Sequence, residues 1–187
     1  MPTTHYVALL RGINVSGKNA IRMTALKDSV AGLGFQDVQT YLQSGNIVFR
    51  STKSDETALA AAIQAWITQD FGFEVPVLVL SAQQLGLIAS ANPLWPKTGG
   101  EAAQFHCTFL FQPVAPDLFL ALKLPASVDE QAVLVDRAVL LHCPHGYGKT
   151  KLNNSYFERA LGLCATTRNW RTVLSLQALC HPPQAHL

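Results

Sequence analysis

Two glycine- and lysine-containing segments have residues that could cradle a phosphate. Residues 12–19 read "GINVSGKN", and a P-loop requires G-x-x-x-x-G-K-[ST]. Asn19 stands where that pattern needs the hydroxyl that holds Mg²⁺. The second segment, "HGYGKT" (residues 145–150), has Cys143 at the position of the first glycine. We therefore interpret both segments as turn-rich loops and expect no nucleotide-binding P-loop.

Basic charge is concentrated in two segments that are far apart in the sequence. Residues 11–22 carry a charge of +3 and residues 149–171 carry +4, whereas the whole chain carries +2. The remainder therefore carries −5. The isoelectric point near 8.4 is below the value of about 9 that is typical of nucleic-acid-binding domains. The total charge is therefore no strong sign of an anionic partner, but the concentration of basic charge in two segments indicates anion binding.

The segment "ATTRNWRTV" (residues 165–173) offers a specific anion site. If Thr167 caps the last helix, Arg168 and Arg171 lie in the first turn, where the helix dipole is positive. A phosphate or carboxylate bound there would remove the electrostatic conflict. In the alternative, the arginines face solvent or pair with acids such as Asp136, and Trp170 packs in the core.

The loop 11–22 crowds hydrogen-bond donors between glycines that allow a close backbone approach. In the alternative, its Asn and Ser side chains satisfy the backbone of the loop itself. Our hypothesis is that this loop and the segment 149–171 form one basic cleft between two halves of the protein. The predicted anion-binding residues are Arg11, Asn14, Lys18, Ser44, Asn46, Lys149, Lys151, Arg168, Asn169 and Arg171.

Other chemistry has weaker support in the sequence. His142, Cys143 and His145 are too few for a zinc site, which needs about four ligands, so we predict no metal and no cofactor. The four cysteines form no C-x-x-C pair and are expected to be reduced thiols. No catalytic residue can be assigned, and the sequence leaves open whether the protein is an enzyme.

Hydrophobic periodicity predicts an α+β fold of two ferredoxin-like halves. The first half has apolar strands and amphipathic helices in the order β-α-β-β-α-β, the split βαβ arrangement. A second series in the same order follows, and it ends in an additional C-terminal helix. The predicted domains are residues 1–91 for the first half, 92–104 for a linker with two prolines and two adjacent glycines, and 105–187 for the second half.

Three long segments resemble one family of bacterial proteins. They read "YVALLRGINVSGKNAIRM", "VQTYLQSGNIVF" and "KLNNSYFERALGLCATTRNWRTVLSL". The family is the domain of unknown function number 1697, and the resemblance covers about residues 5–179. It implies a tandem ferredoxin-like fold and no known activity. The family pattern "YYPDGIGRS" over residues 142–150 differs from this chain at His142, His145 and Lys149.

Three functions follow from these patterns, in order of preference. The first is the binding of a small phosphate- or carboxylate-bearing ligand in the basic cleft. The second is a structural or protein-interaction role, with a homo-oligomer left open, and the third is nucleic-acid binding. No signal peptide is visible, because the apolar run that begins at Val7 is short and Arg11 ends it. No apolar run approaches the roughly 18 residues that a membrane-spanning helix needs. We therefore expect a cytoplasmic protein with no membrane partner.

Overall fold

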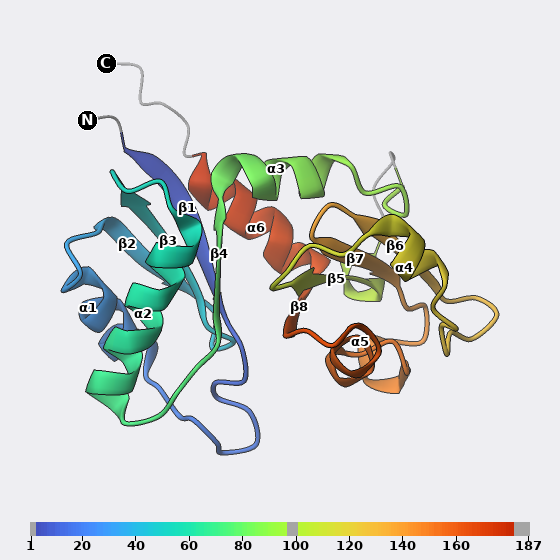
Figure 1. The fold of residues 1–187 in the computed structure, drawn as a ribbon, viewed down its shortest axis with the longest axis horizontal. Helices are drawn as coiled ribbons and strands as arrows, with labels where there is room; N and C mark the ends of the chain where they lie inside the picture. Colours follow the sequence, from blue (N-terminus) through green and yellow to red (C-terminus); the bar gives the residue numbers. More distant parts are fainter. Residues whose placement is uncertain (1–2, 97–100, 182–187) are drawn as a thin grey trace. The chain divides into compact units, whose positions relative to one another are not determined.

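The computed structural model describes residues 3–96 and 101–181. The chain forms two compact units, of which unit 1 comprises residues 1–86 and 176–187 and unit 2 comprises residues 87–175. Each unit combines one four-stranded antiparallel sheet with helices (Figure 1). No helix in the described ranges is long and apolar enough to cross a membrane.

The sheet of unit 1 has the strand order β2-β3-β1-β4. Its strands are β1 (Thr4–Leu10), β2 (Gln36–Tyr41), β3 (Asn46–Ser51) and β4 (Val77–Ser81). All three neighbouring pairs are antiparallel, as the ferredoxin-like topology requires.

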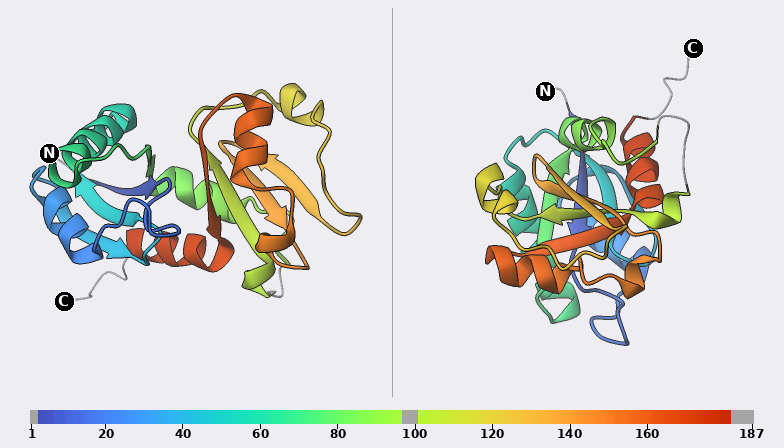
Figure 2. Two further views of the ribbon diagram at one scale, coloured as in Figure 1. Left: turned by 90° about the horizontal axis from the view of Figure 1, so that it is seen from below. Right: turned by 90° about the vertical axis from the view of Figure 1, so that its right-hand side faces the viewer.

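Helices α1 (Met23–Ala31) and α2 (Glu56–Phe71) lie on one face of this sheet (Figure 2, left). Their apolar side chains, such as that of Leu59 in α2, form one core with strand residues such as Ala8 and Phe49. Side-chain and glycine caps mark the two ends of α2. Asp55 accepts a hydrogen bond from the Ala58 amide, and the Gly72 backbone is left-handed with φ 78°.

Unit 2 repeats the topology with the strand order β6-β7-β5-β8. Its strands are β5 (Phe105–Leu110), β6 (Gln131–Val135), β7 (Ala138–His142) and β8 (Ala165–Asn169). Its helices are η1 (Ala102–Gln104), α4 (Pro116–Leu120), η2 (Tyr147–Lys149) and α5 (Asn154–Leu161). Phe119 of α4 and Phe157 of α5 pack on the sheet in a separate core. The prediction of two tandem ferredoxin-like halves is confirmed.

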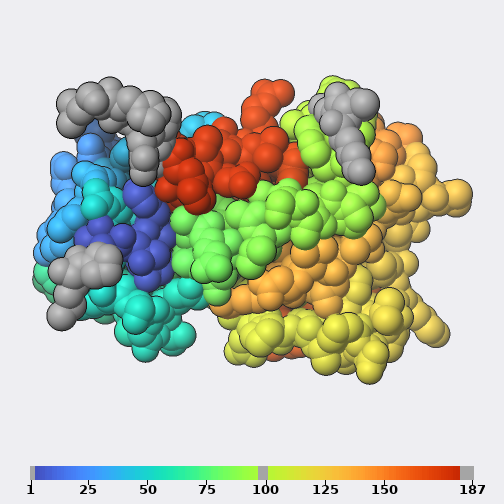
Figure 3. Space-filling view, turned by 90° about the horizontal axis from the view of Figure 1, so that it is seen from above, coloured from blue at the N-terminus to red at the C-terminus, as the bar shows by residue number. Residues whose placement is uncertain are grey.

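Two further helices have residues in both units, namely α3 (Ala82–Ser90) and α6 (Trp170–Cys180). A capping box opens α3: the Gln84 amide donates to Ser81 Oγ, and the Ser81 amide donates to Gln84 Oε1. Within unit 1, Gly86 of α3 lies beside Gln177 of α6, and Figure 3 shows the two helices, green and red, side by side.

The start of α6 corrects the sequence prediction. We expected Thr167 to cap the last helix, with Arg168 in its first turn. Instead β8 continues to Asn169, because residues 165–169 pair with β5 along their whole length. The helix starts at Trp170, which is fully buried, in agreement with the alternative in which this residue packs in the core. Arg168 is therefore a strand residue and does not lie in the first turn of the helix.

Candidate functional site

The loop between β1 and α1, residues 11–22, is a series of tight turns (Figure 1). Asn14, Ser16 and Asn19 all have φ near +50°, a region that non-glycine residues seldom occupy. Lys18 lies at the tip, where its amide donates to the Val15 carbonyl, and its side chain is exposed. The following helix begins only at Met23, so the loop lacks the P-loop geometry, in agreement with the sequence analysis.

Asn14 holds this loop in place. Its Nδ2 donates to the carbonyls of Ile21 and Gln43 at 3.1 and 2.9 Å, and its Oδ1 accepts from the Ile21 amide at 2.8 Å. One side chain thus joins the two ends of the loop to the turn between β2 and β3. These bonds match the alternative in which the loop's Asn side chains satisfy the backbone.

The β2–β3 turn packs closely against the same loop. Asn46 is fully buried, and its Nδ2 donates to the Tyr41 carbonyl and to Ser44 Oγ. Gly45 has φ 78°, and a Cβ there would lie 2.7 Å from Ile13 Cδ1. Only glycine fits this position, because both the backbone conformation and the space exclude a side chain.

The N-terminus of α1 has no internal cap. Arg22 is the N-cap residue, its side chain makes no capping hydrogen bond, and no acid lies in the first turn. The first helical amide with an acceptor is that of Leu26, so the amides of residues 23–25 have no hydrogen-bond partner in the described part of the chain. Such groups and the helix dipole attract anions.

The other described α-helices each have an N-terminal feature, a capping side chain or a proline and an acid in the first turn, that α1 lacks. Side chains of Asp55, Ser81, Asn153 and Asn169 accept amide hydrogen bonds at the starts of α2, α3, α5 and α6. Helix α4 has a proline in its first turn and the acid Asp117. The open N-terminus of α1 is therefore a particular property of this helix.

A surface hollow of about 580 Å³ lies at this open helix end. It is lined, within unit 1, by Asn14, Ala20, Ile21, Arg22, Met23, Thr24 and Gln43. No acid is among these residues. The exposed Arg22 has no ion-pair partner in the described ranges, and Thr24 adds an exposed hydroxyl. The hollow therefore combines a guanidinium, a hydroxyl and free amides, all of which donate hydrogen bonds.

The predicted residues of unit 2 lie in two places. Lys149, in η2, and Lys151, just before α5, are both exposed. Asn169 ends β8, where its Nδ2 donates to the Ala102 carbonyl and its Oδ1 accepts from the amide of Arg171. Arg171 is exposed in the first turn of α6.

Arg168 is the most deeply buried of the predicted basic residues. Its side chain is only 6% exposed, and it lies in β8 opposite Cys107 of β5. Nη1 donates to Thr166 Oγ1 at 2.8 Å and to the Thr167 carbonyl at 3.0 Å. This guanidinium is thus held by its own strand, which gives it a fixed orientation.

A buried polar cluster lies on the helix-facing side of the second sheet. Thr167 Oγ1 donates to Asn154 Oδ1, and it also contacts the hydroxyls of Thr108 and Tyr147 at 2.7 and 3.0 Å. The Tyr147 ring stacks on His106, which contacts Asn169. Burial lowers the pKa of His106 to about 4, although a backbone hydrogen bond with Gln104 offsets part of the shift. The imidazole is therefore neutral at pH 7.

The thiols and the metal-ligating residues form no further site in the described ranges. No cluster of three or more His, Cys, Asp or Glu side chains is present there. Cys107, Cys143 and Cys180 are buried, and burial raises the pKa of each thiol, for Cys143 and Cys180 to about 11. Such thiols are poor nucleophiles because little thiolate forms near neutral pH.

The structure brings together some of the predicted residues and adds others. Asn14 lines the hollow, and Ser44 and Asn46 lie in the neighbouring turn. The meeting of segments 11–22 and 149–171 stays a prediction. Sequence reasoning missed Arg22 and Thr24 as site residues. The available signal was the absence of Ser, Thr, Asp or Asn immediately before the helix predicted at Met23.

These features define an α+β protein of two ferredoxin-like units with a donor-lined hollow at an open helix end. Residues 3–140 match the family described as "Protein of unknown function (DUF1697)", and the chain belongs to that family. No curated protein sequence matches it.

A similar fold is found among the solved structures. One such structure is that of the conserved bacterial protein SP0830 from Streptococcus pneumoniae, with 24% sequence identity and a TM-score of 0.73. The match covers 96% of this chain and 99% of the other. At this identity the likeness shows the fold alone.

Proposed function

We propose that the protein binds a small phosphate- or carboxylate-bearing ligand, and that the hollow at the N-terminus of α1 holds the anionic group. The observation that carries this proposal is the coincidence of an uncapped helix end, an exposed Arg22 and a hollow without acids. An anion there would accept hydrogen bonds from amides that otherwise have no protein acceptor.

The expected affinity follows from these groups. An anion at a helix N-terminus is stabilised by about 0.3–2 kcal/mol, and a hydrogen bond to a charged partner adds about 1.5–3 kcal/mol. The sum of about 1.8–5 kcal/mol corresponds to a dissociation constant between about 50 and 0.2 mM for a bare anion. Tighter binding requires the rest of a ligand to fill the hollow, whose volume of about 580 Å³ is typical of small-molecule sites.

The rigid loop supports the proposal because it fixes the donors before a ligand binds. Asn14 joins the loop to the β2–β3 turn, so Arg22 and the first turn of α1 start from a defined position. Preorganised donors bind more tightly, since less conformational entropy is lost on binding. The basic residues predicted in segment 149–171 stay candidates for additional ligand contacts.

A thermal-shift screen tests this function with inorganic phosphate, pyrophosphate, sugar phosphates, nucleotides, small dicarboxylates and short RNA. A ligand at 100 times its dissociation constant adds about 2.7 kcal/mol, or about 5–10 °C for a chain of this length. We expect Arg22→Gln to lose most of the shift. Arg159→Gln, an exposed arginine of α5 in unit 2, is the matched control and should keep it.

The outcomes separate the alternatives. If no anion shifts the melting temperature of the wild type, or if Arg22→Gln keeps the full shift, the proposed site is wrong. A shift given only by RNA and lost steeply with salt would favour nucleic-acid binding instead.

A further inference from the structure

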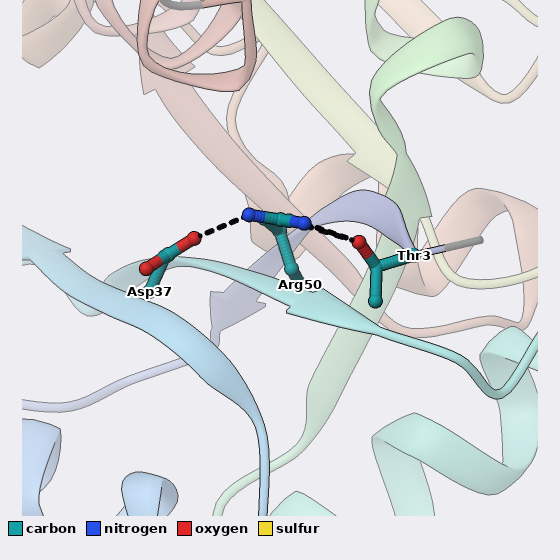
Figure 4. A network of polar contacts seen from close by, with 3 residues as sticks. All are labelled: Thr3, Asp37 and Arg50. Atoms are coloured by element: carbon teal, nitrogen blue, oxygen red, sulfur yellow. Dashed lines mark hydrogen bonds and ion pairs between the residues drawn. The ribbon is translucent and has the colours of Figure 1, made fainter. Parts of the chain in front are cut away.

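Two arginines of unit 1 differ in whether their guanidinium groups are already occupied. Arg50 Nη1 donates at 2.7 Å to Asp37, a residue with φ 51°, and Arg50 Nε donates to Thr3 Oγ1 at 3.0 Å (Figure 4). The exposed side chain of Arg22 lines the hollow and has no ion-pair or hydrogen-bond partner in residues 3–96 and 101–181. Its planar fork is therefore available for two oxygens of one anion, the bidentate geometry that arginine favours.

The donors around this guanidinium suit one class of anion better than another. A carboxylate has only two oxygens, and a bidentate arginine occupies both of them. A phosphate monoester has three terminal oxygens and carries a charge of about −1.5 to −2 at pH 7. Its third oxygen can accept from the Thr24 hydroxyl and the amides of residues 23–25 while the other two stay on Arg22. The hollow therefore matches a phosphate more closely than a carboxylate.

Gln43 brings a second polar side chain to the hollow, from the turn between β2 and β3. Its main-chain carbonyl accepts from Asn14 Nδ2, but its exposed carboxamide bonds no described residue. Both N–H groups of Asn14 Nδ2 are used by the loop and the turn. A carboxamide both donates and accepts, so Gln43 can bind hydroxyl groups of an uncharged part of a ligand.

The rest of the hollow has an aliphatic wall, formed by Ala20, Ile21 and Met23. None of the described residues that line it is aromatic. Nucleobases in proteins are commonly held by stacking on aromatic rings, for which this wall offers no platform. Its C–H surface and the volume of about 580 Å³ suit a small non-aromatic body of the size of a monosaccharide.

We infer that the ligand is the phosphate monoester of a small hydroxylated body, a sugar or polyol phosphate, with its phosphate on Arg22 and Thr24 and its hydroxyls on Gln43. This inference rests on the proposed function, because it takes the hollow as the anion site. It goes further in that it ranks carboxylates and nucleotides below sugar phosphates. It also divides the roles: Arg22 and Thr24 recognise the phosphate, and Gln43 recognises the body.

Matched ligands test this class in NMR titrations of the full chain. Glucose 6-phosphate and glucuronate share one sugar ring and differ in the anionic group at C6. We expect glucose 6-phosphate to bind at least about tenfold more tightly, the effect of one additional charge-assisted hydrogen bond. Ribose 5-phosphate and AMP share a phosphorylated ribose and differ by the base. AMP should bind no more tightly than ribose 5-phosphate, because the hollow has no ring on which the base could stack.

Gln43→Ala separates the body of the ligand from its phosphate. It should weaken glucose 6-phosphate binding about fivefold to tenfold and leave inorganic phosphate unaffected, since the main-chain carbonyl that Asn14 binds is retained. Gln39→Ala, at an exposed glutamine of β2, is the matched control and should bind both ligands like the wild type. Thr24→Val should weaken both ligands by a similar factor.

The outcomes distinguish this inference from the proposed function. If inorganic phosphate does not bind at up to about 100 mM, or binds equally to Arg22→Gln, the anion site is wrong and the inference is overturned with it. If phosphate binding depends on Arg22 but glucuronate binds as tightly as glucose 6-phosphate, the site stands and only the ligand class is wrong. The class is equally overturned if AMP binds more tightly than ribose 5-phosphate, or if Gln43→Ala leaves glucose 6-phosphate binding unchanged.

Discussion

The two units share one topology but differ in the connection between their first strand and first helix. In unit 1 it is the loop 11–22, with three basic residues and an uncapped helix behind it. In unit 2 it is the short segment 111–115, which has no charge and leads to a helix with Pro116 and Asp117 in its first turn. Apolar periodicity and burial specify the fold in both units, whereas the proposed anion site lies at a loop of only one.

The helix-facing sides of the two sheets differ as well. In unit 1 the central strand contributes Tyr6 and Ala8 to an apolar core. Equivalent positions in unit 2 are His106 and Thr108, which join the polar cluster around Thr167. Unit 1 is thus stabilised mainly by apolar packing on this face, and unit 2 also depends on the hydrogen bonds around Thr167 and on a neutral imidazole.

The largest expected difference concerns two glycines with similar backbone conformations. Gly45→Ala in unit 1 should cost about 2–5 kcal/mol, because the new Cβ is strained by φ 78° and collides with Leu10 and Ile13. Gly162→Ala in unit 2, with φ 68° and open space, should cost only about 1–2 kcal/mol. Urea unfolding measures both, and equal costs would show that the turn and the loop of unit 1 are not tightly packed.

The next effect is a dependence on pH that belongs to unit 2. His106 has a pKa of about 4 in the folded state and about 6.5 when unfolded, so the unfolded state gains a proton first as the pH falls. The folded state therefore has its full stability with respect to this group above pH 6.5. It loses about 3 kcal/mol of unfolding free energy as the pH falls from 6.5 to 4.

His106→Phe should abolish this part of the pH dependence and preserve the stack on Tyr147. Urea unfolding at pH 7 and pH 4 compares the variant with the wild type, and NMR titration of the imidazole gives the pKa directly. A midpoint near 6.5 would mean that the ring is solvated and that the polar cluster is open.

Asn14→Ala should cost about 2 kcal/mol, because three hydrogen bonds at the loop of unit 1 are lost. Asn153→Ala, which removes the cap of α5 in unit 2, should cost about 1 kcal/mol. The two variants should also differ in anion affinity: Asn14→Ala should weaken binding because it disturbs the hollow, whereas Asn153→Ala should leave it unchanged. A variant at Asn14 with normal stability and normal anion affinity would contradict its role in holding the loop.

The smallest effect concerns the ion pair at the β2 edge. Asp37 and Arg50 are 60% and 35% exposed, so their coupling should be below about 1 kcal/mol. A double-mutant cycle with Asp37→Asn and Arg50→Gln measures it, because Asn tolerates the left-handed backbone of Asp37. A coupling above about 2 kcal/mol would mean that the edge contributes substantially to folding.

The sequence predicted the elements of both units well where local signals agree. Apolar runs located the strands, and the amphipathic helices lie between them in the predicted order β-α-β-β-α-β. The prediction was wrong at residues 167–169, where threonines and polar residues look like a helix start. The pairing of these residues with β5 makes them a strand, and a long-range pairing cannot be predicted from the local sequence pattern.

The site was less predictable, because it depends on which donors are already used. Asn14 and Asn46 were chosen as ligand contacts, but their side chains hold the backbone of the loop and the turn. Arg22 was overlooked, although it directly precedes α1. Whether a polar side chain is free or occupied follows from the folded loop and not from its composition.

The most direct test of the anion site is a titration with pyrophosphate followed in amide NMR spectra. We expect saturable shifts of the amides of residues 23–25, which have no acceptor within the described chain, together with the Arg22 side chain. The amides at the start of α5, where Asn153 already provides a cap, should barely move. Shifts at α5 with none at α1, or no saturable shift at either helix, would contradict the proposed function.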